Sequence, residues 1–222
     1  MGTMSVLERE MYSEAEAARL LEVPQQTLHY WLEGKRYRGR EYAPVIREKP
    51  TRRRTVTWAE FVEAGLLSQY RQQNIPLDEL RQFIAYLRNK VGVPYPLASE
   101  RPWAISGKLV IEAQDASGLP AEFWLVAPVG NQPLLLPPAQ EFLDHVQFEQ
   151  EIVARWHPVP GSPVVIDPDA RSGRPSVGGI STSVINDYAD DGYSYNEIAA
   201  EFGLDVHQVQ MAVSYELSRP AA

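Results

Sequence analysis

The sequence predicts an α+β fold, mostly α, with a winged helix-turn-helix at the N-terminus, a small mixed β middle segment and a three-helix, helix-turn-helix-like domain at the C-terminus. Three observations support this prediction. Residues 13–34 and 58–89 show apolar side chains at helical spacing between capping signals. Prolines interrupt short apolar runs in the middle of the chain. Three further amphipathic segments with capping residues follow residue 181.

The chain of 222 residues is long enough for two or three small domains. The patterns place the boundaries as follows: a tail at 1–12, the winged helix-turn-helix at 13–90, the mixed β region at 91–156 and the C-terminal helical domain at 157–222.

Residues 13–34 are predicted to form two short helices joined by a tight turn. Ser13 and Glu16 have the spacing of a capping box, Pro24 separates the helices, and Gly34 ends the second one. The second helix, about residues 25–33, leaves polar side chains on its outer face: Gln25, Gln26, Thr27, His29, Tyr30 and Glu33. Gln can bind the edge of adenine and Thr can contact a thymine methyl group, so this pattern indicates a DNA-reading helix. A small helical hairpin with a polar exterior fits the same residues.

The charge distribution points to a local site for a polyanion. The formal net charge is 21 − 29 = −8, yet residues 30–54 hold nine Lys or Arg against three Glu, which gives +6. A basic hairpin is predicted over 35–57, with the chain returning through 52–57. The cations expected near phosphates are Lys35, Arg36, Arg38, Arg40, Arg52, Arg53 and Arg54. A flexible, solvated basic loop is the alternative reading of these charges.

Two further helices are predicted at about 58–73 and 77–89. With them, residues 12–90 resemble the winged DNA-binding domain of MerR-type regulators. The matching text is YSEAEAARLLEVPQQTLHYWLEG followed by RRRTVTWAEFVEAGLLSQYRQQNIPLDELRQFI. The long dimerising helix of that family is missing, because Pro94 and Pro96 end the helical region.

The middle region is read as a mixed β unit. Residues 107–113 are predicted to form a strand, residues 115–120 a turn, and residues 123–129 a buried strand. The pattern at 140–155 fits either a strand or a helix. This apolar region is interpreted as core, with a partner-binding surface as the alternative.

At the C-terminus, a strand at 164–166 and an acidic turn at 167–169 precede helices at about 182–190, 195–202 and 206–217. Ser194 and Glu197 form a second capping box, and Asp205 is placed to cap the last helix. This segment resembles a family of domains of unknown function found in antitoxins of bacterial toxin–antitoxin operons. The shared text is VVIDP, then GRPSVGGISTSVI, then DGYSYNEIAAEFGLDVHQVQMAVSYE; the family usually has Gly-Thr-Arg where this chain has Gly179, Ile180 and Ser181.

Together the two resemblances imply an antitoxin of the VapB type, with operator DNA and a PIN-like ribonuclease toxin as its partners. The residues proposed to contact the toxin are Trp103, Phe123, Trp124, Arg155, Trp156, Arg171 and Arg174. Residues 157–222 carry three Lys or Arg against nine Asp or Glu, a net charge of −6 that would repel phosphate. We therefore expect them to contact protein and to support a homodimer.

The sequence gives no support for catalysis or for a bound cofactor. It has no Cys, which excludes disulfides and thiolate-ligated metals, and none of its four His has a second His at metal-ligand spacing. No metal site and no catalytic residue is predicted, and Asp167 and Asp169 are read as a structural turn. No signal peptide or membrane span is visible, so a cytoplasmic protein is expected. Two hypotheses besides the antitoxin remain: a MerR-like regulator that senses a small molecule, and a scaffold that binds only protein.

Overall fold

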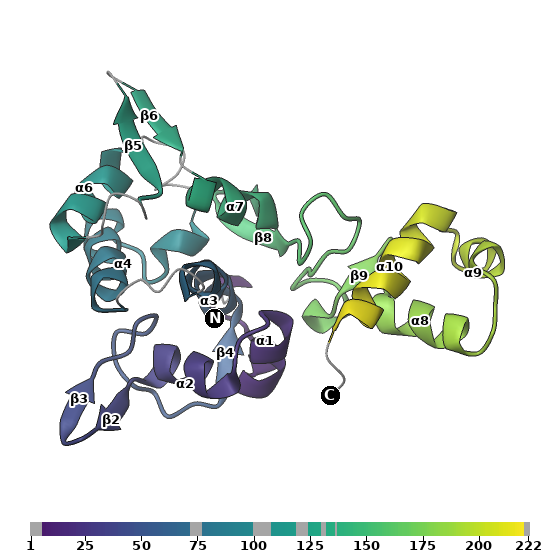
Figure 1. Cartoon of the computed structure of the whole chain (residues 1–222), viewed down its shortest axis with the longest axis horizontal. Helices are drawn as coiled ribbons and strands as arrows, with labels where there is room; N and C mark the ends of the chain where they lie inside the picture. Colours follow the sequence, from purple (N-terminus) through teal and green to yellow (C-terminus); the bar gives the residue numbers. More distant parts are fainter. Residues whose placement is uncertain are drawn as a thin grey trace, which may run out of the picture. The chain divides into compact units, whose positions relative to one another are not determined.

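The computed structural model describes residues 6–71, 77–99, 108–118, 124–129, 132–135 and 137–219, and it confirms an α+β fold that is mostly helical (Figure 1). The chain divides into two compact units. The N-terminal unit comprises residues 1–143 and 148–153, and the C-terminal unit comprises residues 144–147 and 154–222. The middle region predicted at 91–156 therefore does not form a unit of its own, because most of it joins the N-terminal unit.

Short helices and two-stranded ladders make up the N-terminal unit. In chain order its elements are η1 (Val6–Glu8), β1 (Glu10–Ser13), α1 (Glu14–Leu20), α2 (Gln25–Glu33), β2 (Lys35–Tyr37), β3 (Arg40–Tyr42), β4 (Thr55–Thr57), α3 (Trp58–Arg71), α4 (Leu77–Val91), η2 (Pro96–Ala98), α6 (Lys108–Ser117), β5 (Val126–Val129), β6 (Gln132–Leu135) and α7 (Pro137–His145). Helix α3 supplies much of the core, where the rings of Trp58 and Phe61 stack with centroids 5.6 Å apart. The predicted starts of α3 at Trp58 and α4 at Leu77 are confirmed.

Strand β4 pairs with the N-terminal strand β1 and not with the basic hairpin. Tyr12 lies opposite Val56, and both side chains are buried. Two predictions are therefore wrong. The segment at 1–12 is not simply a tail, since residues 10–12 belong to β1, and the returning segment 52–57 is not the second strand of the wing. The burial of these two apolar side chains against α3 accounts for the pairing.

The strand predicted at 107–113 is instead the helix α6. Val110, Ala113, Gln114 and Ser117 are buried, which is the i, i+3, i+4, i+7 spacing of one helix face. The β-branched pair at 110–111 favours a strand locally, but packing against α4 decides the outcome. The ambiguous segment at 140–155 contains both kinds of structure, because α7 is followed by the strands β7 (Val146–Glu149) and β8 (Ile152–Trp156).

The C-terminal unit is a three-helix domain that follows a short β hairpin. After β8 its elements are η4 (Arg171–Gly173), β9 (Ser176–Val177), β10 (Ile180–Ser181), α8 (Thr182–Asp190), α9 (Tyr195–Phe202) and α10 (Val206–Ser218). These helix bounds agree with the predicted ones to within a residue. Both capping residues are confirmed, since Ser194 accepts a hydrogen bond from the backbone of Glu197 and Asp205 accepts one from Gln208. The strand predicted at 164–166 makes only isolated bridges.

Candidate nucleic-acid interface

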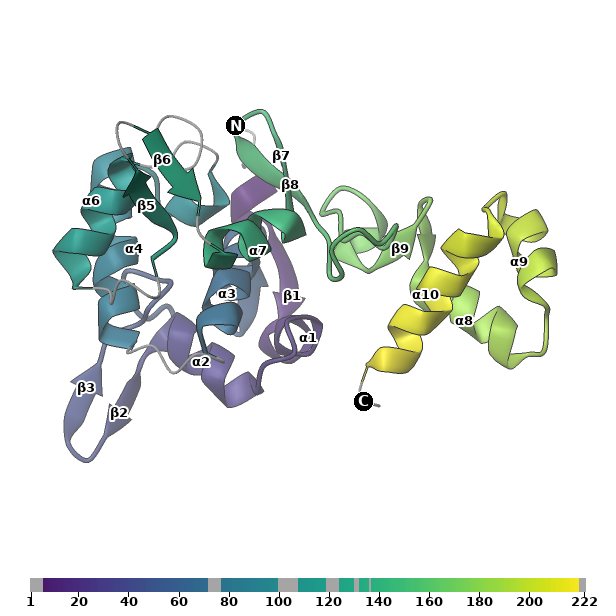
Figure 2. The same cartoon turned by 45° about the horizontal axis from the view of Figure 1, so that its top comes forward.

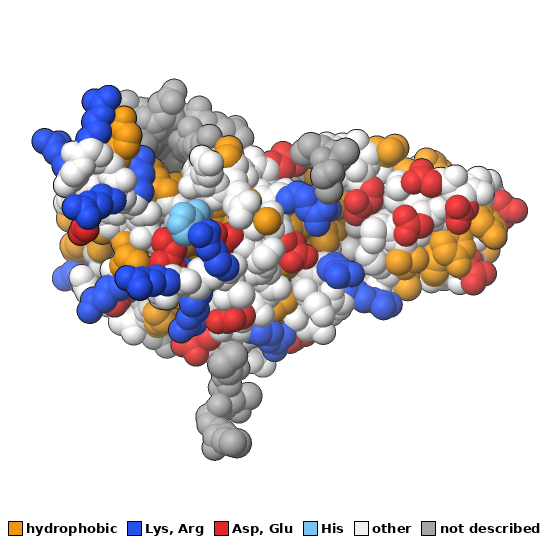
Figure 3. Space-filling model, turned by 90° about the horizontal axis from the view of Figure 1, so that it is seen from below, with side chains coloured by type: hydrophobic (Ala, Val, Ile, Leu, Met, Phe, Trp, Pro, Cys, Tyr) orange, Lys and Arg blue, Asp and Glu red, His pale blue; other side chains and the backbone are white. Residues whose placement is uncertain are grey.

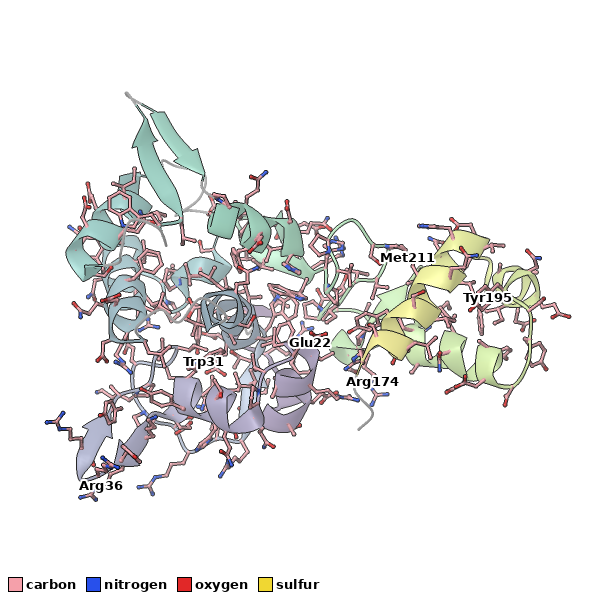
Figure 4. All side chains as sticks on the ribbon, viewed as in Figure 1. Glu22, Trp31, Arg36, Arg174, Tyr195 and Met211 are labelled. Carbon is pink, nitrogen blue, oxygen red and sulfur yellow. The ribbon has the colours of Figure 1, made fainter. Side chains whose placement is uncertain are left out.

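Helix α2 is anchored to the core by one face and exposes the other. Leu28, Trp31 and Leu32 are at most 1% exposed, and Figure 4 shows Trp31 inside the unit. On the opposite face Gln25 and Gln26 are exposed, and Thr27 is half-buried at the start of the helix. Gln25 and Gln26, which are predicted to face a DNA groove, therefore lie on the outer face of α2.

The wing is the hairpin formed by β2 and β3, which stands away from the rest of the unit in both views (Figures 1 and 2). Arg38 and Gly39, at its tip, both have positive φ, as a two-residue hairpin turn requires. Four cations of the hairpin are exposed: Lys35, Arg36, Arg38 and Arg40. Figure 4 shows Arg36 extending outward from the hairpin. The Lys35 ammonium lies 4.4 Å from the ring centroid of Tyr30, so a cation–π contact joins the wing to α2.

Gly34 connects α2 directly to the wing. It has φ +73° and ψ −170°, a conformation open essentially to glycine alone. A Cβ built on Gly34 would lie 2.3 Å from the carbonyl oxygen of Tyr42, a backbone atom that cannot move aside without opening the hairpin. Glycine is therefore required where α2 meets the wing.

We expect Gly34→Ala to lower the free energy of unfolding by about 2–4 kcal/mol, because it combines backbone strain with overpacking. Gly39→Ala is the matched control, since Gly39 also has a positive φ but a Cβ there meets nothing within 4 Å. Denaturant unfolding of both variants measures the difference. Equal destabilisation of the two would show that the close approach to Tyr42 does not matter.

A buried arginine fixes the segment that follows the wing. The Arg47 guanidinium donates to both carboxylate oxygens of Glu60, with Nε–Oε1 at 2.7 Å and Nη2–Oε2 at 3.0 Å, and it also binds Glu33. It donates further to the Thr51 hydroxyl at 2.7 Å and to the carbonyl oxygen of Thr55 at 2.8 Å. Desolvation alone would lower the pKa of Arg47, but the bonds to Glu60 and the charge of Glu33 raise it.

Glu33, the last residue of α2, connects that helix to the hydrogen-bond network of Arg47. Its carboxylate accepts from the Thr51 hydroxyl at 2.9 Å and from the backbone N–H of Arg52 at 2.8 Å. Burial alone would raise the pKa of Glu33, but the Arg52 N–H, the Thr51 hydroxyl and Arg47 outweigh it and lower the pKa. The prediction that Glu33 lies on the outer face of α2 is wrong, since its side chain is only 7% exposed. Residues 51–55 are held in place and do not form a loose basic loop.

His29 and Arg54 share a second buried carboxylate. Glu14, at the start of α1, is 1% exposed; His29 Nδ1 lies 2.9 Å from its Oε1, and Arg54 Nη1 lies 2.9 Å from its Oε2. Arg54 Nη1 also lies 3.3 Å from His29 Nδ1, so the three side chains form one cluster. Glu14 therefore positions two of the side chains that the sequence assigns to DNA.

Four of the exposed cations line a groove of about 830 Å³ between the end of α2, the wing and the segment at 50–54, together with Glu33, Glu41 and Glu48. The four cations are Lys35, Arg36, Arg52 and Arg54. Figure 3 shows Lys and Arg side chains gathered on this face of the N-terminal unit. Cations around a polar helix face suit a phosphate backbone whose base edges meet that helix.

We expect Gln26→Ala and Arg53→Ala to weaken DNA binding in different ways. Gln26→Ala should relax the preference at one base position and cost about 1–3 kcal/mol on the specific site. Arg53 is exposed, and its ion pair with Glu10 is 3.3 Å long, so Arg53→Ala should weaken binding to every sequence and lower the salt slope by about one unit. Titrations of specific and random duplexes at several salt concentrations separate the two. Equal effects of both variants on the two duplexes would refute the assignment.

The residues assigned to a toxin lie in different surroundings. Trp103 and Phe123 lie outside the described residues, and Trp124 is half-buried. Trp156 is 4% exposed and stacks on the ring of His145, so it belongs to the packing and is not available as a surface anchor. Arg155 donates to Asp167 Oδ2 at 2.8 Å, while Arg171 and Arg174 are exposed.

No group of three or more His, Asp or Glu side chains among the described residues is arranged to hold a metal ion. No described helix is long and apolar enough to cross a membrane.

Comparison with known proteins supports the DNA-binding character of this face. Residues 10–84 match a family model described as "Putative DNA-binding HTH domain". The chain is 32% identical to "Uncharacterized protein Rv2308" of Mycobacterium tuberculosis, over 97% of this chain and 93% of that protein. It is 23% identical to "Putative antitoxin VapB45" of the same organism, over 91% and 92% of the two chains. The crystal structure of Rv2018 from Mycobacterium tuberculosis shares the fold, with a TM-score of 0.72, 20% identity and coverage of 93% and 99%.

Proposed function

This chain belongs to the same family as Rv2308 of Mycobacterium tuberculosis, and from its cationic helix-turn-helix face we propose that it is an antitoxin that binds DNA. In this proposal it represses its own operon by binding operator DNA, and it neutralises a PIN-like ribonuclease by direct binding. It acts by binding and performs no chemistry itself.

DNA binding is supported chiefly by the cations around α2, whose side chains contact neighbouring residues of the fold. Lys35 is fixed against Tyr30, and Arg54 against Glu14, so the cations do not have to be ordered when DNA binds. A preformed face loses less conformational entropy on binding than a flexible basic loop would. The full-length similarity to "Putative antitoxin VapB45" supports the antitoxin part.

Coexpression tests the antitoxin part directly. The full-length chain is produced with the product of the reading frame next to its gene, the pair is applied to size exclusion, and RNA cleavage by the nuclease is assayed with and without this chain. We expect a stable complex and suppressed cleavage. Unchanged cleavage at saturating antitoxin, or no complex, would end the antitoxin proposal.

A cavity favours one other function, a MerR-like regulator that senses a small molecule. It has a volume of about 330 Å³, within the range of small-molecule sites, and lies against the segment that follows the wing. Its lining includes Arg47, Glu60, Arg88 and Tyr95. A ligand there would touch the same network that holds Arg52 to Arg54. DNA binding without a nuclease partner would favour this reading.

A further inference from the structure

The helices of the C-terminal unit form a surface without cations, which we call the acidic face. Residues 180–218 contain no Lys or Arg and seven acidic residues: Asp187, Asp190, Asp191, Glu197, Glu201, Asp205 and Glu216. All except Glu216 are exposed. Figure 3 shows acidic and hydrophobic side chains, and no Lys or Arg, at the far end of this unit.

Aromatic rings lie exposed among these acids. Tyr193 is 51% exposed and Tyr195 is 37% exposed (Figure 4 labels Tyr195). The ring centroid of Tyr188 lies 5.2 Å from that of Tyr193 and 5.0 Å from that of Phe202. Tyr193 therefore packs on Tyr188, which itself packs on Phe202. Tyrosine is a favoured anchor at protein interfaces, and its face accepts an arginine guanidinium.

The negative charge of three acids is not offset within these helices. Glu197 and Asp205 cap α9 and α10, and Glu216 binds Thr182. Asp187 and Asp190, by contrast, lie in the last turn of α8 and Asp191 is its C-cap, where the helix dipole disfavours negative charge. Asp190 accepts a hydrogen bond from the Asn186 amide at 2.9 Å, but that amide is neutral. Because residues 180–218 lack Lys and Arg, no cation of these helices offsets them. An external cationic partner would.

The other unit carries the complementary surface. Its cationic face, Lys35, Arg36, Arg38, Arg40 and Arg52 to Arg54, is exposed, and residues 30–54 have a net charge of +6 against −7 for residues 180–218. Exposed guanidinium groups can pair with aspartates and stack on tyrosine rings at once.

We propose that the acidic face of one copy binds the cationic face of a second copy, and that this contact and DNA exclude one another. Each such contact would join the C-terminal unit of one copy to the N-terminal unit of the other. DNA displaces the acidic face because a duplex presents a denser and longer array of negative charge. Self-association thus competes with DNA for the cationic face and weakens binding to random sequences.

The test measures self-association and DNA affinity on full-length protein. The variant Asp187→Asn/Asp190→Asn/Asp191→Asn is compared with Asp115→Asn/Glu141→Gln/Asp144→Asn, which removes the same charge from exposed positions on α6 and α7. Sedimentation velocity is run at 50 and 300 mM NaCl, with and without a random-sequence duplex. Circular dichroism confirms that each variant is folded.

We expect the unsubstituted chain and the control variant to self-associate at 50 mM salt, and to dissociate at 300 mM salt or on addition of the duplex. The α8 variant should remain monomeric and bind the duplex about tenfold more tightly at 50 mM salt. A chain that is monomeric at 50 mM salt, self-association that persists in the α8 variant, or self-association that survives saturating duplex would overturn the proposal. None of these results depends on a toxin.

Discussion

Replacement of Arg47 by methionine is expected to lower the free energy of unfolding by about 3–5 kcal/mol and to abolish DNA binding. Arg47 is 6% exposed and is the cation that faces the buried carboxylates of Glu33 and Glu60. Without it, two negative charges remain in the interior unbalanced, and the Thr51 hydroxyl and Thr55 carbonyl lose a donor. The segment that carries Arg52 to Arg54 then loses its link to α2.

Arg53→Met is the matched control for this experiment. Arg53 is 61% exposed, so its loss should change stability by no more than about 0.5 kcal/mol while still weakening DNA binding. Denaturant unfolding and duplex titration are both measured on the two variants. If Arg47→Met unfolds like the unsubstituted protein, the buried network does not hold the interface together.

The sequence predicts α1 to α4 and α8 to α10 well because their boundaries depend on local signals, whereas α6 and α7 lack such signals. The capping hydrogen bonds of Ser194, Glu197 and Asp205 join residues only three positions apart in the sequence. Gly34 ends α2, as glycine commonly ends helices. The sequence also predicts which side chains of α2 are exposed. Apolar spacing alone assigns Leu28 and Trp31 to the core and leaves Gln25 and Gln26 outside.

Long-range pairing is what the sequence does not reveal. The partner of β4 is β1, more than 40 residues away, and no local pattern distinguishes that pairing from one with the nearer wing. Arg47 reads as one more member of a basic run, yet it is buried because Glu33 and Glu60 lie 14 and 13 positions away on two different helices. The burial of Glu14 was likewise not predictable, because its partners His29 and Arg54 lie 15 and 40 positions away in the sequence.

The contribution of one buried carboxyl group, Glu63, to the stability of the protein is expected to fall as pH rises from about 4.5 to about 8. Glu63 on α3 is completely buried; its Oε1 accepts from the Leu97 N–H at 3.2 Å, and its Oε2 has no hydrogen-bond partner among the described residues. Burial raises the pKa of Glu63 to about 8, against the opposing charge of Arg88 and the Leu97 N–H, and Glu60 raises it further.

The sign follows from the two end states. A group whose pKa is raised in the folded protein stabilises the fold at pH values below its pKa in the unfolded chain. That stabilisation is lost as the pH rises through its pKa in the folded protein. Glu63→Gln stays neutral at every pH. The free energy of unfolding of the variant minus that of the unsubstituted chain should therefore rise between pH 4.5 and pH 8.5. We expect this rise to be about 2–4 kcal/mol. Thermal unfolding across this range measures it, with the exposed Glu141→Gln as the control. Parallel pH profiles for Glu63→Gln and the unsubstituted chain would mean that Glu63 is charged in the folded protein and balanced by the charge of Arg88.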